Sequence, residues 1–348
     1  MLRTELLEKL ELVAPGLSSI DLIPLLCHIW FKGDTIMGYN DQIAIEAPCK
    51  TNIKGAVPGQ TLISLLRSSD RKNVELTVKD KEVHIALQNS NFKLGMLPAE
   101  DFIFEMPKPK GGKLPVEFAK FRAGIACCMR SISTDTSIPD QLGITLLVED
   151  NNLLLFSTNN STISHAKVPL LGKVPFEKRV VLSASFCKEM LELTKLVVGE
   201  VYIADDYSLL TVGAISLFGR LIEVDKPIPF AKVLAHHLPG DYKKEVIAMP
   251  EKLAMMLARA MIITDSPTEQ TRTLVTVKGG EMTLLSKSGK GEVKDKVVVE
   301  GHPDVAVKLE PKLLSLGLED FDKFLITDRC AIMSKGSTKL YLVAATSG

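Results

Sequence analysis

Apolar and polar residues alternate in short runs along most of the chain, and small polar turns separate the runs. Three pairs of runs predict β-hairpins, over residues 28–41, 144–160 and 273–288. The first hairpin turns at Gly33-Asp34, the second at Asp150-Asn151-Asn152 and the third at Gly279-Gly280. Turns of this composition between β-rich runs are strong hairpin signals. The chain is therefore predicted to contain much antiparallel sheet.

A second pattern follows each of these hairpins. It consists of a short apolar helix and a further hairpin whose turn contains an aspartate. The helices are predicted over residues 58–69, 183–197 and 310–321. The turn aspartates, which lie about 125 residues apart, are Asp80, Asp206 and Asp328. This spacing predicts an internal repeat with three copies.

A helix also opens each copy, over residues 4–13, 115–131 and 250–263. In the third of these, Leu253, Leu257 and Ala260 recur at the spacing of one helix face. Each copy thus runs helix, strands, helix, strands, which predicts an α+β domain with two helices packed on antiparallel sheets. The predicted domains, joined by Pro-, Gly- and Lys-rich links, are residues 1–110, 111–243 and 244–348.

Composition and charge narrow the class of protein. The 348 residues are 46% apolar and 24% charged, enough to build two or three domains, and the formal net charge of zero argues against a large basic surface. No apolar run reaches the roughly 18 residues that a membrane helix needs, and residues 1–16 have the pattern of an amphipathic helix rather than a signal peptide. Six cysteines without a C-x-x-C pair indicate reduced thiols, so a cytoplasmic protein is predicted.

The sequence contains no recognisable catalytic motif. It has no Gly-rich phosphate loop, no G-x-S-x-G and no carboxylate pair with a supporting base. The pair His236-His237 is predicted to lie in a strand or an extended link, where neighbouring side chains point apart, and no third ligand is near. We therefore predict no catalytic residue, no metal site and no cofactor.

Three segments of the chain resemble a known family. They are "FKLGMLPAEDF" at residues 92–102, "FGRLIEVDKPIPF" at residues 218–230 with "HHLP" after it, and "LARAMII" at residues 257–263. In this order they resemble the bacterial-type sliding clamp, the beta subunit of the replicative DNA polymerase III, and the resemblance covers essentially the whole chain. It implies a head-to-tail homodimer whose six domains form a ring around duplex DNA and tether the polymerase for processive synthesis. A clamp loader would be a separate protein.

The resemblance implies that two helices of each domain face the DNA. The helix over residues 115–131 has the clearest basic surplus, and the loop over residues 131–141 follows it. Contacts there would go to phosphates without reading bases. The DNA-binding residues implied in this way are Lys9, Gln60, Arg67, Lys120, Arg122, Arg130, Ser133, Thr134, Lys188, Lys195, Lys252 and Lys312.

The resemblance also implies a pocket between the second and third domains that binds a short linear peptide of the polymerase and of the loader. Its residues would be Thr158, Asn160, Ile163, Pro229, Val233, Leu234, Val343 and Ala344. The family commonly has Thr-Asp-Gly-His-Arg-Leu where this chain has "TNNSTI", and a Met-Pro-containing tail where this chain ends in "AATSG".

The dimer interface follows from an exposed strand edge. The strand that contains Phe92 and Leu94 is predicted to pair with the third domain of the other chain, where it would meet Ile262 and Ile263. The alternative function is a ring or scaffold of the same fold that recruits partners without enclosing DNA. Retention on circular DNA, with loss when the circle is cut, discriminates the two.

Overall fold

The computed structural model describes residues 1–20, 23–87, 90–102, 104–110, 112–176, 179–240, 242–265 and 272–345. The chain divides into two compact units, each built from segments that interleave along the sequence. Unit 1 comprises Met1–Phe118, Lys173–Glu177 and Ser185–Leu221. Unit 2 comprises Ala119–Gly172, Lys178–Ala184 and Ile222–Gly348. The three-domain division of residues 1–110, 111–243 and 244–348 stays a prediction.

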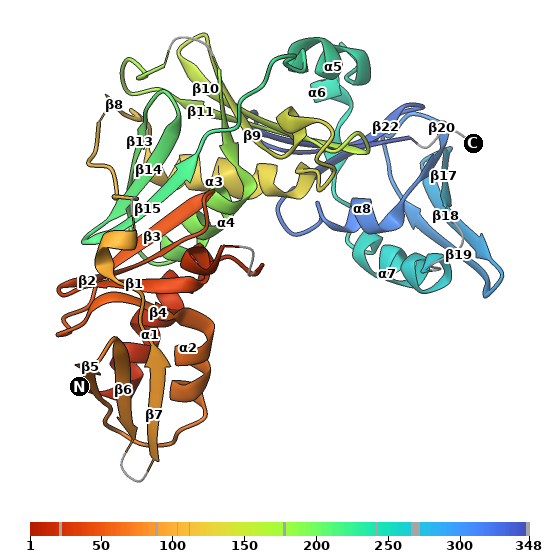
Figure 1. Cartoon of the computed structure of the whole chain (residues 1–348). Coiled ribbons are helices and arrows are strands. Elements are labelled where there is room, and N and C mark those ends of the chain that lie inside the picture. Colours follow the sequence, from red (N-terminus) through yellow and green to blue (C-terminus); the bar gives the residue numbers. More distant parts are fainter. Residues whose placement is uncertain are drawn as a thin grey trace. The chain divides into compact units, whose positions relative to one another are not determined.

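Unit 1 contains an eight-stranded sheet in the order β4-β1-β2-β3-β15-β14-β13-β8 and a three-stranded sheet in the order β5-β6-β7 (Figure 1). Its strands are β1 His28–Lys32, β2 Thr35–Tyr39, β3 Ile43–Pro48, β4 Lys54–Pro58, β5 Glu75–Lys79, β6 Glu82–Leu87, β7 Ser90–Gly95, β8 Gly112–Lys113, β13 Glu200–Ile203, β14 Tyr207–Val212 and β15 Ile215–Arg220. Its helices are α1 Arg3–Val13, α2 Gly59–Arg67 and α4 Ala184–Leu193.

Unit 2 contains an eight-stranded sheet in the order β12-β9-β10-β11-β23-β22-β21-β16 and a four-stranded sheet in the order β19-β18-β17-β20. Its strands are β9 Gly143–Glu149, β10 Asn152–Thr158, β11 Thr162–Pro169, β12 Val180–Ser183, β16 Ile247–Ala248, β17 Thr273–Lys278, β18 Glu281–Ser288, β19 Gly291–Val298, β20 Val305–Leu309, β21 Lys323–Ile326, β22 Cys330–Lys335 and β23 Lys339–Ala344. Its helices are α3 Phe118–Cys128, α5 Phe230–His237, α6 Tyr242–Glu245, α7 Leu253–Thr264 and α8 Pro311–Ser315.

All six predicted hairpins are confirmed, and so are the six predicted helices. The turn residues explain why. Asp80, Asp150 and Asn151 have positive φ, the left-handed conformation that Asn and Asp tolerate better than most side chains. In α1, Leu6, Leu10 and Val13 are buried at the spacing of one helix face, which packs against β2 and β3.

One predicted element is wrong. The segment that contains His236 and His237 is not an extended link, because it forms α5, and the two histidines lie in its last turn. Pro229 precedes the helix, and the Val233 amide bonds the Pro229 carbonyl at 3.1 Å. The prolines of this run suggest a connection, but its apolar residues Phe230, Val233 and Leu234 recur at helical spacing and pack on buried clusters within unit 2.

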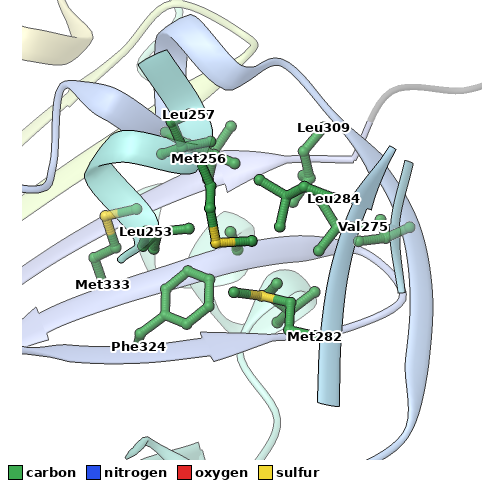
Figure 2. Close-up of a cluster of buried hydrophobic side chains, with 14 of the residues drawn as sticks. Leu253, Met256, Leu257, Val275, Met282, Leu284, Leu309, Phe324 and Met333 are labelled. Carbon is green, nitrogen blue, oxygen red and sulfur yellow. The ribbon is translucent and has the colours of Figure 1, made fainter. Parts of the chain in front are cut away.

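The core around α7 brings together both sheets of unit 2. Figure 2 shows Met256 of α7, Met282 of β18 and Phe324 of β21 pointing toward one another. All three are essentially inaccessible to solvent. Burial of such side chains stabilises the fold by roughly 1.5–3 kcal/mol each. This core holds the β17–β20 sheet against β21–β23.

Candidate functional site

A cavity of about 240 Å³ opens in unit 2. Residues of the β10–β11 turn, of α5 and of strands β22 and β23 contribute to its walls. The lining residues are Ile138, Gln141, Thr158, Asn160, Ser161, Thr162, Ile163, Ile228, Val233, His237, Cys330, Leu342 and Ala344. The cavity therefore combines one polar wall with several apolar side chains, as binding sites for peptides and small molecules do.

The polar wall is the β10–β11 turn, which its own side chains hold in place. Oδ1 of Asn159 accepts hydrogen bonds from the backbone N–H groups of Ser161 and Thr162, at 3.2 and 2.8 Å. The Thr158 hydroxyl donates to the Thr162 carbonyl at 2.8 Å. Asn160 completes the turn with φ of 70°. Side chains that bond their own backbone in this way are typical of rigid turns.

A buried carboxylate positions another part of the cavity wall. Asp140 is 1% exposed and accepts hydrogen bonds from the Thr145 hydroxyl at 2.9 Å and from the Ile228 amide at 2.6 Å. The guanidinium of Arg179 pairs with the same carboxylate. Because buried charges must be paired and hydrogen-bonded, this arrangement holds Ile228 at the edge of the cavity.

An aromatic stack anchors the start of α5. The Phe156 ring stacks on two neighbours. Its centroid lies 4.8 Å from that of Phe230 and 4.5 Å from that of His165. Arg179 lies 6.0 Å from the centroid of Phe230. Burial lowers the pKa of His165 to about 4, so this imidazole is neutral at neutral pH.

The cavity walls carry no formal charge at neutral pH. No Asp, Glu, Lys or Arg occurs among the described residues that line it. Burial raises the pKa of the Cys330 thiol to about 11. Burial, together with the nearby His236 and Arg329, lowers the pKa of His237. An uncharged ligand is therefore favoured, since a charged group would lose its hydration without gaining a partner.

The structure brings five of the eight predicted pocket residues to this cavity: Thr158, Asn160, Ile163, Val233 and Ala344. The other three do not line it. Pro229 is exposed before α5, and Leu234 packs with the apolar clusters beside it. Val343 is buried in the core around α7, because successive side chains of a strand point to opposite faces and Ala344 lines the cavity.

Sequence reasoning missed several lining residues. Leu342 could have been found, because it lies two positions before Ala344 on β23 and period two places both on one face. Ile138 and Gln141 carried no such signal, since they lie in the loop assigned to DNA. Cys330 and Ile228 reach the cavity through pairing and packing between distant segments, which no local pattern reveals.

The predicted DNA-binding residues lie on helices or beside them, in both units. Exposed side chains belong to Gln60, Arg67, Lys120, Thr134, Lys188, Lys195, Lys252 and Lys312, and half-buried ones to Lys9, Arg122, Arg130 and Ser133. Among the exposed basic groups, Arg67 pairs with Glu11, and Lys195 pairs with Glu192. Exposed pairs of this kind contribute little stability and exchange readily with other anions.

Arg130 differs from the other basic residues in its contacts. Its guanidinium pairs with Asp320, donates to the Leu316 carbonyl at 2.9 Å and lies 5.8 Å from the centroid of the Phe321 ring. These contacts tie the 3-10 helix Met129–Ser131 to the segment after α8. A phosphate would have to displace these contacts in order to bind Arg130.

The loop over residues 131–141 folds back on itself. The Ser133 amide bonds the Gln141 carbonyl at 2.8 Å, and its hydroxyl accepts from the Asp135 amide at 3.0 Å. Thr134 is exposed at the tip. Hydrogen bonds from Ser137 lower the pKa of Asp135, which keeps one exposed negative charge beside Ser133 and Thr134.

β7 and β19 are two of the strands that end a sheet in the described part of the chain. β7 pairs with β6 alone, and β19 pairs with β18 alone. Phe92 and Leu94 are half-buried on β7, directly opposite Ile85 and Val83 of β6. On α7, Ile262 is 69% exposed and Ile263 is half-buried. All four predicted interface residues thus present some apolar surface to solvent.

No described helix combines the length and apolar character needed to span a membrane. Within the same residues, no group of three His, Cys, Asp or Glu side chains gathers as a metal ion would require.

Comparisons with known proteins point to one family. Residues 1–106 match the family model described as DNA polymerase III beta subunit, N-terminal domain. The DNA polymerase sliding clamp of Bacillus subtilis superposes with a TM-score of 0.84 at 16% identity, and it covers 100% of this chain and 98% of that one. The beta subunit of DNA polymerase III from Thermotoga maritima gives 0.82 at 18% identity over 100% and 98%.

The chain has the fold of the bacterial beta sliding clamps. Among curated proteins, the beta sliding clamp of Staphylococcus aureus is 20% identical over 246 residues. That alignment includes 64% of this chain, and the chain spans 63% of the length of this relative. The predicted resemblance and the α+β fold class are confirmed.

Proposed function

We propose that the chain is a sliding clamp. Two copies, joined head to tail, enclose duplex DNA in the cytoplasm and tether a replicative DNA polymerase for processive synthesis. The clamp acts through topology, has no catalytic residue of its own, and is opened by a separate loader. The same cavity of unit 2 receives a short peptide of the polymerase or of the loader.

One observation supports this proposal: the same strand order occurs three times, but in the described part of the chain only two of the three copies have their last strand paired with a neighbouring three-stranded meander. The orders β4-β1-β2-β3, β12-β9-β10-β11 and β20-β17-β18-β19 are the same. So are the meanders β5-β6-β7, β13-β14-β15 and β21-β22-β23. β3 pairs with β15 and β11 pairs with β23, which leaves β19 and β7 as the equivalent open edges. In a dimer, β7 of each copy pairs with β19 of the other copy, so this third type of junction forms twice.

The registers of the two closed junctions predict the third. Ile45 of β3 lies opposite the fourth residue of β2, and Ala166 of β11 lies opposite the fourth residue of β10. Asp295 of β19 is the equivalent residue in the third copy, because it lies opposite the fourth residue of β18. Ile45 pairs with the third residue of β15, and Ala166 pairs with the first residue of β23. By either register, Asp295 faces Ser90 or Phe92 of the other copy.

This register supports the predicted interface. Phe92 and Leu94 would share a face with Asp295, and the Arg259 side chain of α7 binds Asp295 at 2.6 Å. The same face therefore carries α7, whose end exposes Ile262 and Ile263. Apolar groups on a paired edge are the usual means by which such junctions become stable.

Retention on DNA tests the proposal. The protein is loaded onto nicked circular DNA by its own clamp loader and separated from free protein by gel filtration. A clamp stays with the circle and is lost when one restriction cut makes the DNA linear. Equal retention before and after the cut, or none at all, would exclude topological binding. The alternative, a clamp-fold scaffold that recruits partners without enclosing DNA, would then hold.

A further inference from the structure

One edge of β5 in unit 1 carries backbone groups that no described residue pairs. Val74, just before β5, exchanges both of its backbone hydrogen bonds with Met1, at 3.1 Å each. Because the backbone groups of a strand alternate between its two edges, those of Leu76 and Val78 point the same way as those of Val74. Within the described chain β5 pairs with β6 alone, so this edge is open at both residues. Figure 1 shows β5 on the side of its sheet away from β7.

The two equivalent positions are paired in the other copies of the repeat. Counted back from the hairpin turn, they are Val201 and Ile203 in β13, and both pair with the segment that contains β8. In β21 they are Phe324 and Ile326. Phe324 pairs with β16, and the Ile326 amide donates to Nε2 of His302 at 2.8 Å. The fold thus covers this edge in the second and third copies, whereas the described residues of the first copy leave it open.

The open edge borders a groove of about 1000 Å³ whose charge is mainly positive. Its walls include Lys50, Arg71, Lys72, Glu75, Leu76 and Thr77. Lys50 and Lys72 are exposed and form no ion pair with a described residue, while Arg71 lies 3.6 Å from its neighbour Asp70. Among the described lining residues, three cationic side chains therefore face the single carboxylate of Glu75. Such a surface attracts acidic groups.

We propose that this edge binds an extended acidic segment of a partner protein as an additional strand of the β5–β6–β7 sheet. The strand is antiparallel to β5, as β8 is to β13 and β16 is to β21. Its backbone satisfies Leu76 and Val78, and its carboxylates lie beside Lys50 and Lys72. A nucleic-acid backbone fits less well, because phosphates accept hydrogen bonds but donate none and would leave the strand's carbonyl groups unpaired. The site belongs to unit 1, outside the cavity of unit 2, and does not depend on the proposed function.

A short peptide of alternating acids and valines, acetyl-Glu-Val-Glu-Val-Glu-Val-Glu-amide, serves as the probe. One derivative carries methyl groups on its three valine nitrogens, and a second carries them on three glutamate nitrogens instead. Each peptide is titrated into the full-length protein with ¹³C-labelled Leu and Val methyl groups, and the dissociation constant is taken from the shifts of Val74, Leu76 and Val78. A strand directs alternate N–H groups to opposite edges, so only one of the two sets can face β5. One derivative should therefore bind roughly tenfold more weakly than the other.

Variants of the protein assign the binding to this groove. Lys50→Glu combined with Lys72→Glu should weaken binding of the unmethylated peptide roughly tenfold. The matched control, Lys108→Glu with Lys110→Glu, makes the same charge change at exposed lysines of unit 1 that do not line the groove, and should bind as the unmodified protein does. Val78→Pro removes an N–H of the open edge but spares the β5–β6 ladder, so it should also weaken binding. If Val78→Pro does not fold, the two methylated peptides decide by themselves.

A nucleic acid in the groove is the alternative that the same titration tests. An oligothymidylate with as many negative charges as the peptide should leave the methyl groups of Leu76 and Val78 unshifted at moderate ionic strength. Displacement of the peptide by this oligonucleotide overturns the proposal, and so does equal affinity of the two methylated derivatives. An affinity that survives the Lys50→Glu and Lys72→Glu double change overturns the preference for acidic segments. Methyl groups that shift with none of the peptides overturn the site altogether.

Discussion

Replacing Asp140 with alanine removes the carboxylate that holds one wall of the cavity. The single change takes away the partner of Arg179 and the acceptors of the Thr145 hydroxyl and the Ile228 amide. The Arg179 side chain is 17% exposed, so its charge stays largely buried without a counter-ion. Breaking a buried ion pair from one side typically costs about 3–5 kcal/mol. We therefore expect a severe loss of stability.

The expected size of the effect can be measured by thermal unfolding. At about 2–4 °C per kcal/mol, the melting temperature of Asp140→Ala should fall on the order of 10 °C. The double variant Asp140→Ala with Arg179→Met should recover part of that loss, because no unpaired charge remains. Asp135→Ala, which changes an exposed aspartate of the same loop, should have the same melting temperature as the unmodified protein.

The same variant tests the link between this ion pair and the cavity. Freed from Asp140, the Ile228 amide should exchange its hydrogen faster, and proteases should cut the segment before α5 sooner. A melting temperature of Asp140→Ala within about 2 °C of the unmodified protein would refute the reasoning. So would a double variant less stable than the single one.

Three further predictions concern the interface, the pH response and the DNA-facing helices. Replacing Ile262 with Ala and Ile263 with Lys should give a folded monomer in sedimentation, whereas Leu171→Lys, at another exposed apolar residue, should stay dimeric. A neutral His165 with a pKa near 4 takes up no proton between pH 6.5 and 4 while the unfolded chain does, so the folded state should lose up to about 3 kcal/mol as the pH falls through this range. His165→Phe should flatten that part of the curve in urea unfolding, and an unchanged slope would contradict the assignment. Finally, replacing Lys120, Arg122, Lys188 and Lys195 with alanine should weaken DNA retention while the dimer persists. The slope of binding against salt concentration should become smaller by about one unit or less for each lost phosphate contact. Unchanged retention across low and moderate salt would show that these helices do not face DNA.

Elements that depend on neighbours in the sequence could be predicted from the sequence alone. The hairpin turn at Asp80 and the one at Asp150-Asn151 need residues that accept positive φ, and the chain has them at those points. The helix over residues 250–263 follows from Leu253, Leu257 and Ala260 on one face. Because the same local signals recur about 125 residues apart, the repeat and the α+β class could also be predicted from the sequence.

The cavity depended on tertiary structure, because its walls come from segments that are distant in the sequence. Asp140 was assigned to a loop near DNA, yet it is buried and bonds the Ile228 amide 88 residues away. Arg130 was assigned to phosphate contacts, yet it bonds the Leu316 carbonyl 186 residues away. Whether a charged side chain meets solvent or a buried partner depends on which strands pair and which helices pack. Local patterns do not carry that information, since the energy of a buried pair appears only when the chain has brought its two members together.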